Sequence, residues 1–192
     1  MLKNSADAWG LVSKLFHWVA AALIVALLIH GWTMTHLVPR GLRLANYSWH
    51  AAIGYDLLAL TVLRALWRWL AGAPKEIEGL TSLERLGARL GHWALYGLTF
   101  AACLTGWALA GTLRRPLDAK LFGVIDLPAL ASPGNRGLHD ALEEAHEVLV
   151  YGLALFVVGH VVAAVRHHVV KKNAVLTRMT FARKAPALTP GD

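Results

Sequence analysis

The chain has 192 residues, of which 56% are hydrophobic and only 16% charged, a balance too apolar for an ordinary soluble domain. Its formal net charge of +7 does not indicate nucleic-acid binding, because the basic residues cluster beside long apolar segments, as membrane insertion itself selects. The single cysteine, Cys103, excludes both a disulfide framework and a Cys-x-x-Cys-His site for covalent haem.

Four long apolar segments predict an all-α, integral membrane four-helix bundle that forms a single membrane domain over residues 1–192. The first and third segments contain no Asp, Glu, Lys or Arg, and each exceeds the roughly 20 residues that a helix needs to cross a bilayer. The second is interrupted only by Asp56, and the fourth is bounded by Glu147 and Arg166. We expect spans over about residues 15–38, 46–69, 90–112 and 144–167, with a mostly irregular loop and a short helix before the last.

Lysine and arginine counts predict how these spans are oriented. One side holds the amino terminus, the loop between the second and third spans, and the carboxyl terminus, and it carries 13 of the 19 basic residues. The positive-inside rule therefore places both termini in the cytoplasm and the loop over residues 112–147 outside. We do not expect the first span to be a cleaved signal peptide, because its apolar part is too long and no small-residue cleavage site follows it. The basic residues on the cytoplasmic side are Lys3, Lys14, Arg64, Arg68, Lys75, Arg85, Arg89, Arg166, Lys171, Lys172, Arg178, Arg183 and Lys184.

Ten histidines are unusual in so apolar a chain, and ionisable groups inside membrane spans are costly enough to indicate function. His146 and His160 lie 14 residues apart on the fourth span, which places them within roughly 40° of one helix face and about 21 Å apart. His17 lies on the first span at the depth of His160, and His50 lies in the first turn of the second span at the depth of His146. Two facing pairs follow, His17 with His160 near the inner surface and His50 with His146 near the outer surface.

Paired imidazoles at matched depths are typical of axial ligands to haem iron, and two such ligands leave no open coordination site. The pairs therefore predict two noncovalent haems in an electron carrier. Gly54, on the face of His50, and Gly159, beside His160, would let a flat macrocycle approach the backbone. Any one of these histidines alone is more simply explained as an interfacial or hydrogen-bonded residue, so the prediction depends on all four together.

Three further histidines have candidate roles. His92 lies at the inner depth on the third span and competes with His17 or His160 as a ligand; otherwise it hydrogen-bonds to a haem or a quinone. His167 lies close to the face of His160 but two turns further out, which suits contact with a haem propionate or a lipid headgroup. His30 is 13 residues from His17 and turned by about 220°, to the opposite face, so we expect a structural or quinone-lining role rather than ligation.

The order and spacing of these motifs resemble the bacterial cytochrome b561 family over nearly the whole chain. The motifs are Phe16-His17-Trp18, Trp49-His50-Ala51-Ala52-Ile53-Gly54, Leu90-Gly91-His92, Ala145-His146, Gly159-His160 and His167-His168. The resemblance implies a multi-pass protein of the bacterial inner membrane with two haem b groups, one held by His17 and His160 and the other by His50 and His146. The same four-histidine plan recurs in the cytochrome b subunits of respiratory formate dehydrogenases and hydrogenases, so the resemblance specifies the fold and the haems more closely than the reaction.

The activity that the resemblance implies is superoxide oxidase, in which superoxide at the outer face gives electrons through the haems to ubiquinone. Cations in the outer loops would attract the anion, because a local positive field raises encounter rates, although contacts with lipid phosphates explain any one of them as well. These cations are Arg40, Arg43, Arg114, Arg115, Lys120 and Arg136. A quinone site is indicated only by the inner aromatic rim with His92 and His167, and the eight tryptophans equally suit an interfacial belt. The rim consists of Trp18, Trp67, Trp69 and Trp93.

Two other functions stay open. A cytochrome b subunit that passes electrons between a partner dehydrogenase and the quinone pool would share every ligand and differ only in a docking face for its partner. A histidine-rich metal transporter is disfavoured, since the spans offer a single acid, Asp56, and no His-Glu-x-x-His pattern. Asp56 lies about 9 Å deeper than His50 and is turned about 120° from it, so it either relays protons to reduced quinone or packs as a neutral acid between helices.

Overall fold

The computed structural model describes residues 1–77 and 79–181, so Arg183 and Lys184, two of the cations expected in the cytoplasm, lie outside the described residues. Four long helices dominate the structure: α1 (Leu11–His36), α2 (Arg43–Ala71), α3 (Ser82–Thr112) and α4 (Arg136–Val169). A 3-10 turn, η1 (Arg40–Leu42), joins α1 to α2, and two short strands, β1 (Lys120–Leu121) and β2 (Ile125–Asp126), lie between α3 and α4. The all-α class and the four helices expected from the sequence are confirmed.

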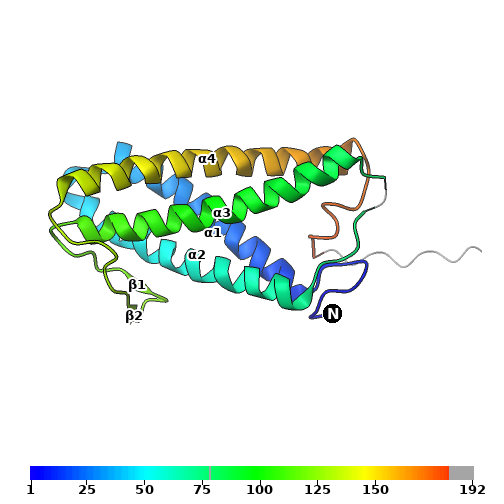
Figure 1. Ribbon diagram of the computed structural model, residues 1–192, viewed down its shortest axis with the longest axis horizontal. Helices are drawn as coiled ribbons and strands as arrows, with labels where there is room; N and C mark the ends of the chain where they lie inside the picture. The colour runs from blue at the N-terminus through cyan, green and yellow to red at the C-terminus, as the bar shows by residue number, and fades with distance from the viewer. Residues whose placement is uncertain (78, 182–192) are drawn as a thin grey trace, which may run out of the picture.

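Successive helices run in opposite directions and form one bundle (Figure 1). α1 packs on α2, α2 on α3, and α3 on α4. One end of the bundle, here called the terminal end, therefore holds residues 1–10, 72–77, 79–81 and 170–181. The other, the loop end, holds residues 37–42 and 113–135, including the hairpin of β1 and β2. The two described ends of the chain thus lie at the same end of the bundle.

The outside of the bundle is apolar. By length and composition, α1, α3 and α4 can each cross a membrane. Large apolar side chains such as Trp93 and Leu155 are 72% and 71% exposed, which suits contact with lipid better than contact with water. In the described part of the chain, α2 is not among these candidate spans, because polar residues such as Asp56, Arg64 and Arg68 lower its mean hydropathy. Its 29 residues are nevertheless long enough to cross a bilayer.

Two helices begin well before the positions that hydrophobicity predicts. α3 begins before residue 90 because Thr81 and Glu84 form a capping box: the Thr81 side chain accepts from the Glu84 N–H at 3.2 Å, and the Glu84 carboxylate accepts from the Thr81 N–H at 3.0 Å. α4 begins before residue 144 because the Asn135 side chain accepts from the Leu138 N–H. The short helix expected before the fourth span is therefore the first part of α4 itself.

The loop between α3 and α4 contains a small hairpin that docks on α2. Lys120 and Asp126 lie opposite each other in the antiparallel pair and form a 3.2 Å ion pair. Phe122 and Gly123 turn the chain with φ values of 52° and 72°. The Asp56 carboxylate accepts a 2.7 Å hydrogen bond from the Phe122 N–H. Asp56 thus fastens the hairpin to α2, a role that neither alternative from the sequence had included.

Candidate functional site

Histidine rings from different helices face one another near both ends of the bundle. At the terminal end, His17 of α1 and His160 of α4 have ring centres 6.2 Å apart. At the loop end, His50 of α2 and His146 of α4 have ring centres 6.3 Å apart. The structure therefore brings together the partners in both of the expected pairs.

Each pair is spaced to hold a metal ion between its rings. Metal–nitrogen bonds of about 2 Å on either side of an ion would place the two ring centres about 6 Å apart, close to the separations in both pairs. In the described part of the chain, α4 packs closely on α3 but not on α1 or α2, so the paired rings project across a wider gap between helices. Also among the described residues, no group of three or more His, Cys, Asp or Glu side chains could hold a metal ion. Two protein ligands per site suit an ion whose remaining ligands come from a prosthetic group, as in haem.

His146 is oriented by α3. Its Nδ1 lies 3.0 Å from the carbonyl oxygen of Ala102 and 3.2 Å from Oγ1 of Thr105. Because a carbonyl only accepts, Nδ1 carries the proton and donates it, and Nε2 keeps its lone pair. This is the arrangement that orients a metal-bound histidine. Gly106 leaves room for the ring, since a Cβ at that position would lie 3.0 Å from Cε1 of His146.

His50 lies against the loop-end half of α1. A Cβ at Gly31 would approach Cε1 of His50 to 3.3 Å, so this second glycine also fits a histidine ring closely. Nδ1 of His50 is buried, and no hydrogen-bond partner for it exists among the described residues. Buried polar atoms usually have a hydrogen-bond partner, so this nitrogen is available for an interaction with a further group at the loop-end pair.

His30 is a neighbour of the loop-end pair that the rotation estimate did not anticipate. Its ring centre lies 5.8 Å from that of His50, and its Nε2 hydrogen-bonds to Oδ1 of Asn46 at 3.1 Å. α1 runs obliquely across the other helices (Figure 1), so the face that it turns toward the bundle changes along its length. His17 and His30 can therefore both point inward although they lie on different faces of α1.

His92 of α3 lies beside the terminal-end pair, at the depth that the sequence predicted for it. Its ring centre is 5.4 Å from that of His160. Its Nδ1 lies 2.6 Å from the carbonyl oxygen of Ala88, one turn earlier on α3, so Nδ1 donates and Nε2 keeps a lone pair. Nε2 of His92 can therefore accept a hydrogen bond from, or coordinate, a group that binds at the terminal end.

His167 lies further toward the terminal end. Its Nδ1 accepts a 3.0 Å hydrogen bond from the side-chain amide nitrogen of Asn173. Nearby, Glu84 of α3 forms 3.2 Å ion pairs with Arg166 and Lys171, which tie the end of α4 to the start of α3. His167 thus belongs to the polar rim of the bundle, consistent with the outward position that its spacing predicts.

Arg64 is a residue of the terminal-end site that the sequence analysis did not single out. Its guanidinium donates a 3.0 Å hydrogen bond to Nδ1 of His17. The signal was present, because Arg64 follows His50 on α2 by 14 residues, the same interval that separates His146 and His160 on α4. α2 thus presents a histidine at one depth and an arginine at the other.

The other predicted residues are placed as follows. All six outer cations lie at the loop end; Arg43 donates to the carbonyl oxygens of Val38 and Thr35, and Lys120 pairs with Asp126. The remaining four are exposed: Arg40, Arg114, Arg115 and Arg136.

In the aromatic rim, Trp18 donates to the Met179 carbonyl, Trp67 donates to Ser13, and Trp69 and Trp93 are exposed. A Cβ added at Gly54 or Gly159 would meet no atom within 4 Å, so both positions border open space.

The chain is similar to one protein family and to curated proteins over most of its length. A family model described as prokaryotic cytochrome b561 matches residues 8–182. Cytochrome b561 homolog 2 of Escherichia coli (strain K12) is 31% identical over 178 residues, which cover 92% of this chain and 93% of that protein. The probable superoxide oxidase CybB of Yersinia pestis is 31% identical over 169 residues, which cover 85% of this chain and 90% of that protein.

Proposed function

Since the chain belongs to the prokaryotic cytochrome b561 family, whose members are haem b proteins of electron transfer in membranes, we propose that it holds two haem b groups between its facing histidines. His17 and His160 would hold one, and His50 and His146 the other. The observation that carries this proposal is the presence of two facing pairs, with ring centres 6.2 and 6.3 Å apart, at opposite ends of one bundle. The family match and the relatives confirm the family expected from the sequence motifs, whereas the ligand pairs and the number of haems are proposals.

The four histidines suit this task chemically. Haem iron, when bound, supplies a one-electron couple between its ferric and ferrous forms. Neutral imidazoles of His17 and His160, and of His50 and His146, would hold the iron of each haem, so each site would pass electrons without offering an open position to oxygen. Ala102 orients His146 for ligation by accepting its Nδ1 proton. We place His92 outside the ligand set, as a residue that hydrogen-bonds to a haem or a quinone.

The proposed topology has all four helices crossing the bacterial inner membrane as one domain over residues 1–192. α2 is included because it is 29 residues long and packs between α1 and α3, which are both apolar candidate spans. We place the terminal end in the cytoplasm, since most of the lysines and arginines of the chain lie on that side. The loop end, with His50 and His146, then faces outward.

The reaction that we propose is oxidation of superoxide at the loop end with reduction of ubiquinone. Two superoxide anions lose one electron each and become two molecules of oxygen, and one quinone takes up the two electrons and two protons to become quinol. The name of the Yersinia pestis relative supports this reaction, as do the four exposed arginines of the loop end, whose field would raise the encounter rate of an anion. These arginines are Arg40, Arg114, Arg115 and Arg136.

The chain purified alone in detergent tests this reaction, with superoxide and a soluble ubiquinone analogue as the only substrates. We expect quinol to form at the expense of superoxide, and replacing the four exposed arginines by glutamine should slow the reaction and reduce its dependence on salt. A chain that keeps both haems but is inert toward superoxide would instead be a cytochrome b subunit that serves a partner dehydrogenase. A chain without haem would contradict both functions.

A further inference from the structure

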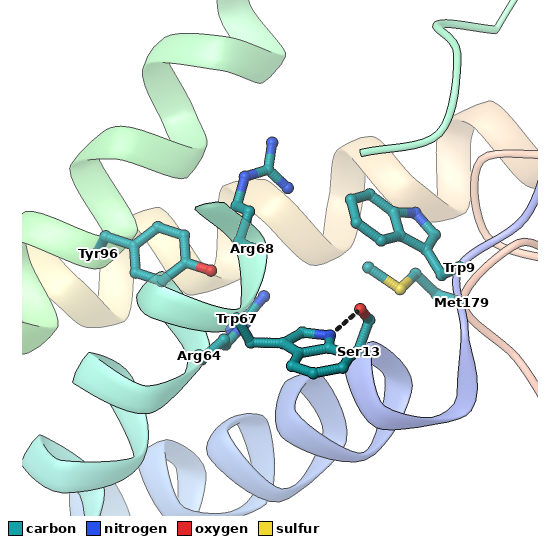
Figure 2. A pocket seen from close by; sticks show the side chains of 7 residues that line it. All are labelled: Trp9, Ser13, Arg64, Trp67, Arg68, Tyr96 and Met179. Carbon is teal, nitrogen blue, oxygen red and sulfur yellow. Dashed lines mark hydrogen bonds between the residues drawn. The ribbon is translucent and has the colours of Figure 1, made fainter. Parts of the chain in front are cut away.

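A narrow cleft opens at the terminal end beside Arg64, whose guanidinium donates to His17. Its walls include Arg64, Trp67 and Arg68 of α2, Tyr96 of α3, and Trp9 and Met179 from near the two ends of the chain (Figure 2). Its volume is about 20 Å³, room for roughly one water molecule or one oxygen atom of a bound group. The cleft is therefore suited to the tip of a ligand that enters from the bundle or the membrane surface.

Two arginines give this cleft an uncompensated positive charge. Arg64 and Arg68 lie one turn apart on α2, where like charges repel each other. The Arg64 guanidinium lies 5.1 Å from the ring centre of Tyr96, and that of Arg68 lies 5.4 Å from the ring centre of Trp9, so aromatic faces hold both cations in place. Within the described ranges, no Asp or Glu carboxylate forms an ion pair with either arginine. Arg64 is half-buried and Arg68 is exposed at the rim of the cleft, and a partly buried cation in a membrane protein calls for an anion.

The hydrogen bond between Arg64 and His17 is incompatible with iron ligation by Nε2 of that histidine. Arg64 has only donors, so Nδ1 of His17 must accept, and a neutral ring then carries its proton on Nε2. A histidine that binds iron through Nε2 carries the proton on Nδ1 instead, as His146 does toward Ala102. Arg64 therefore needs a different acceptor whenever His17 serves as an axial ligand.

We propose that Arg64, with Arg68 beside it, binds a propionate carboxylate of the haem held by His17 and His160. The inference rests on the proposed function, since it requires a haem at the terminal end. Haem b carries two propionates, and the planar guanidinium of arginine matches a carboxylate through two parallel hydrogen bonds. When the haem is bound, Arg64 donates its hydrogen bond to this carboxylate instead of to Nδ1 of His17. Nδ1 can then carry the proton of the neutral ring. A phospholipid phosphate presents the same oxyanion chemistry and is the competing source of the anion.

Redox titration of the purified wild type and of four variants tests the proposal. Arg64→Gln should lower the reduction potential of the terminal-end haem, because loss of a cation favours the more positively charged ferric form. We expect about a tenfold loss of preference for the reduced form, which corresponds to about 59 mV for one electron. Arg68→Gln should act in the same direction more weakly, and Arg64→Lys should keep part of the wild-type potential. Arg85→Gln removes an exposed cation at the same end outside the cleft and should match the wild type.

Two further measurements separate a propionate from a lipid. The propionate bending band in the resonance Raman spectrum should shift in Arg64→Gln and not in Arg85→Gln. Loading the protein with haem dimethyl ester, whose carboxylates are blocked, should shrink the difference in potential between the wild type and Arg64→Gln, because only the through-space effect of the cation then remains. A difference that is as large with the ester as with haem b, together with less bound phospholipid in Arg64→Gln, overturns the proposal.

The outcomes also separate this proposal from the one on which it rests. If Arg64→Gln binds two haems and changes neither their reduction potentials nor the propionate Raman band, the role of Arg64 alone is overturned. A chain without a terminal-end haem overturns the proposed function and the role of Arg64 together. If Arg64→Gln does not accumulate, Arg64→Lys and the ester-loaded wild type provide the same comparison.

Discussion

Gly106 leaves the space in which the His146 ring sits, so Gly106→Ala should weaken binding of the loop-end haem selectively. The added Cβ would lie 3.0 Å from Cε1 and 3.4 Å from Nδ1 of His146, closer than ordinary van der Waals contact. The ring would have to retreat by a few tenths of an ångström. It is held from the same side by the 3.0 Å hydrogen bond from Nδ1 to the Ala102 carbonyl, which the displacement would distort.

The expected loss combines two effects on the site with one on the helix. Weakening one hydrogen bond costs about 1 kcal/mol, a factor of about five in affinity. Disturbing the groups that orient a metal ligand typically costs about 10- to 100-fold. Alanine is favoured over glycine in a helix interior by about 0.5–1 kcal/mol, which offsets any strain in the folded chain. We therefore expect the loop-end haem to bind about 5- to 100-fold more weakly, with little change in the stability of the protein.

Haem loss to an excess of a haem-scavenging protein measures this effect, with the phases for the two haems assigned from the single-haem variants His146→Ala and His160→Ala. Gly97→Ala is the matched control: it makes the same exchange on the same helix at an exposed position, where a Cβ would meet no atom within 4 Å. The phase assigned to the loop-end haem should quicken in Gly106→Ala only. Equal loss rates in the two variants, or equal acceleration of both phases, would refute the reasoning from the ring contact.

Four further substitutions test other parts of the structure. His146→Ala should remove the loop-end haem and His160→Ala the terminal-end haem, so each should lower the haem-to-protein ratio from about two to about one; a variant that keeps two haems speaks against its ligand pair. Asp56→Ala should release the hairpin, because a hydrogen bond to a charged acceptor contributes about 1.5–3 kcal/mol, so the Phe122 amide should exchange with deuterium about 10- to 100-fold faster at unchanged haem content. Unchanged exchange at that amide would show that Asp56 does not hold the hairpin. Thr81→Ala should cost the start of α3 about 0.5–2 kcal/mol, visible as faster exchange in its first turn, and a loss of haem in this variant would contradict a purely local role for the cap.

The spacing of residues along single helices was the most informative feature of the sequence. The interval between His146 and His160 determines their common face and their depths, because a helix has a fixed rise and rotation per residue. Apolar length likewise predicted the bodies of all four helices. Their starts were less predictable, since hydropathy marks the membrane-facing part of a helix and says nothing of a polar first turn. The capping pair Thr81 and Glu84 is readable in the sequence, but only once the helix is allowed to begin outside the apolar segment.

Relations between helices could not be read in the same way. His30 reaches the loop-end pair because α1 crosses the bundle obliquely, and a tilt angle depends on packing rather than on spacing within one helix. Gly31 and Gly106 border the histidine rings, whereas Gly54 and Gly159, chosen for their positions beside the ligands, border open space. Asp56 pairs with a backbone amide 66 residues away, which no local pattern specifies.

The central claim, that two haem b groups are held noncovalently between facing histidines, is tested most directly by one measurement on the chain purified in detergent. This is the difference spectrum between the dithionite-reduced and oxidised protein, recorded with the haem-to-protein ratio. From the two facing pairs we predict two low-spin b haems per chain, each of which would be held by two histidines. A preparation that binds no haem, or whose haem iron is high-spin, would contradict the claim.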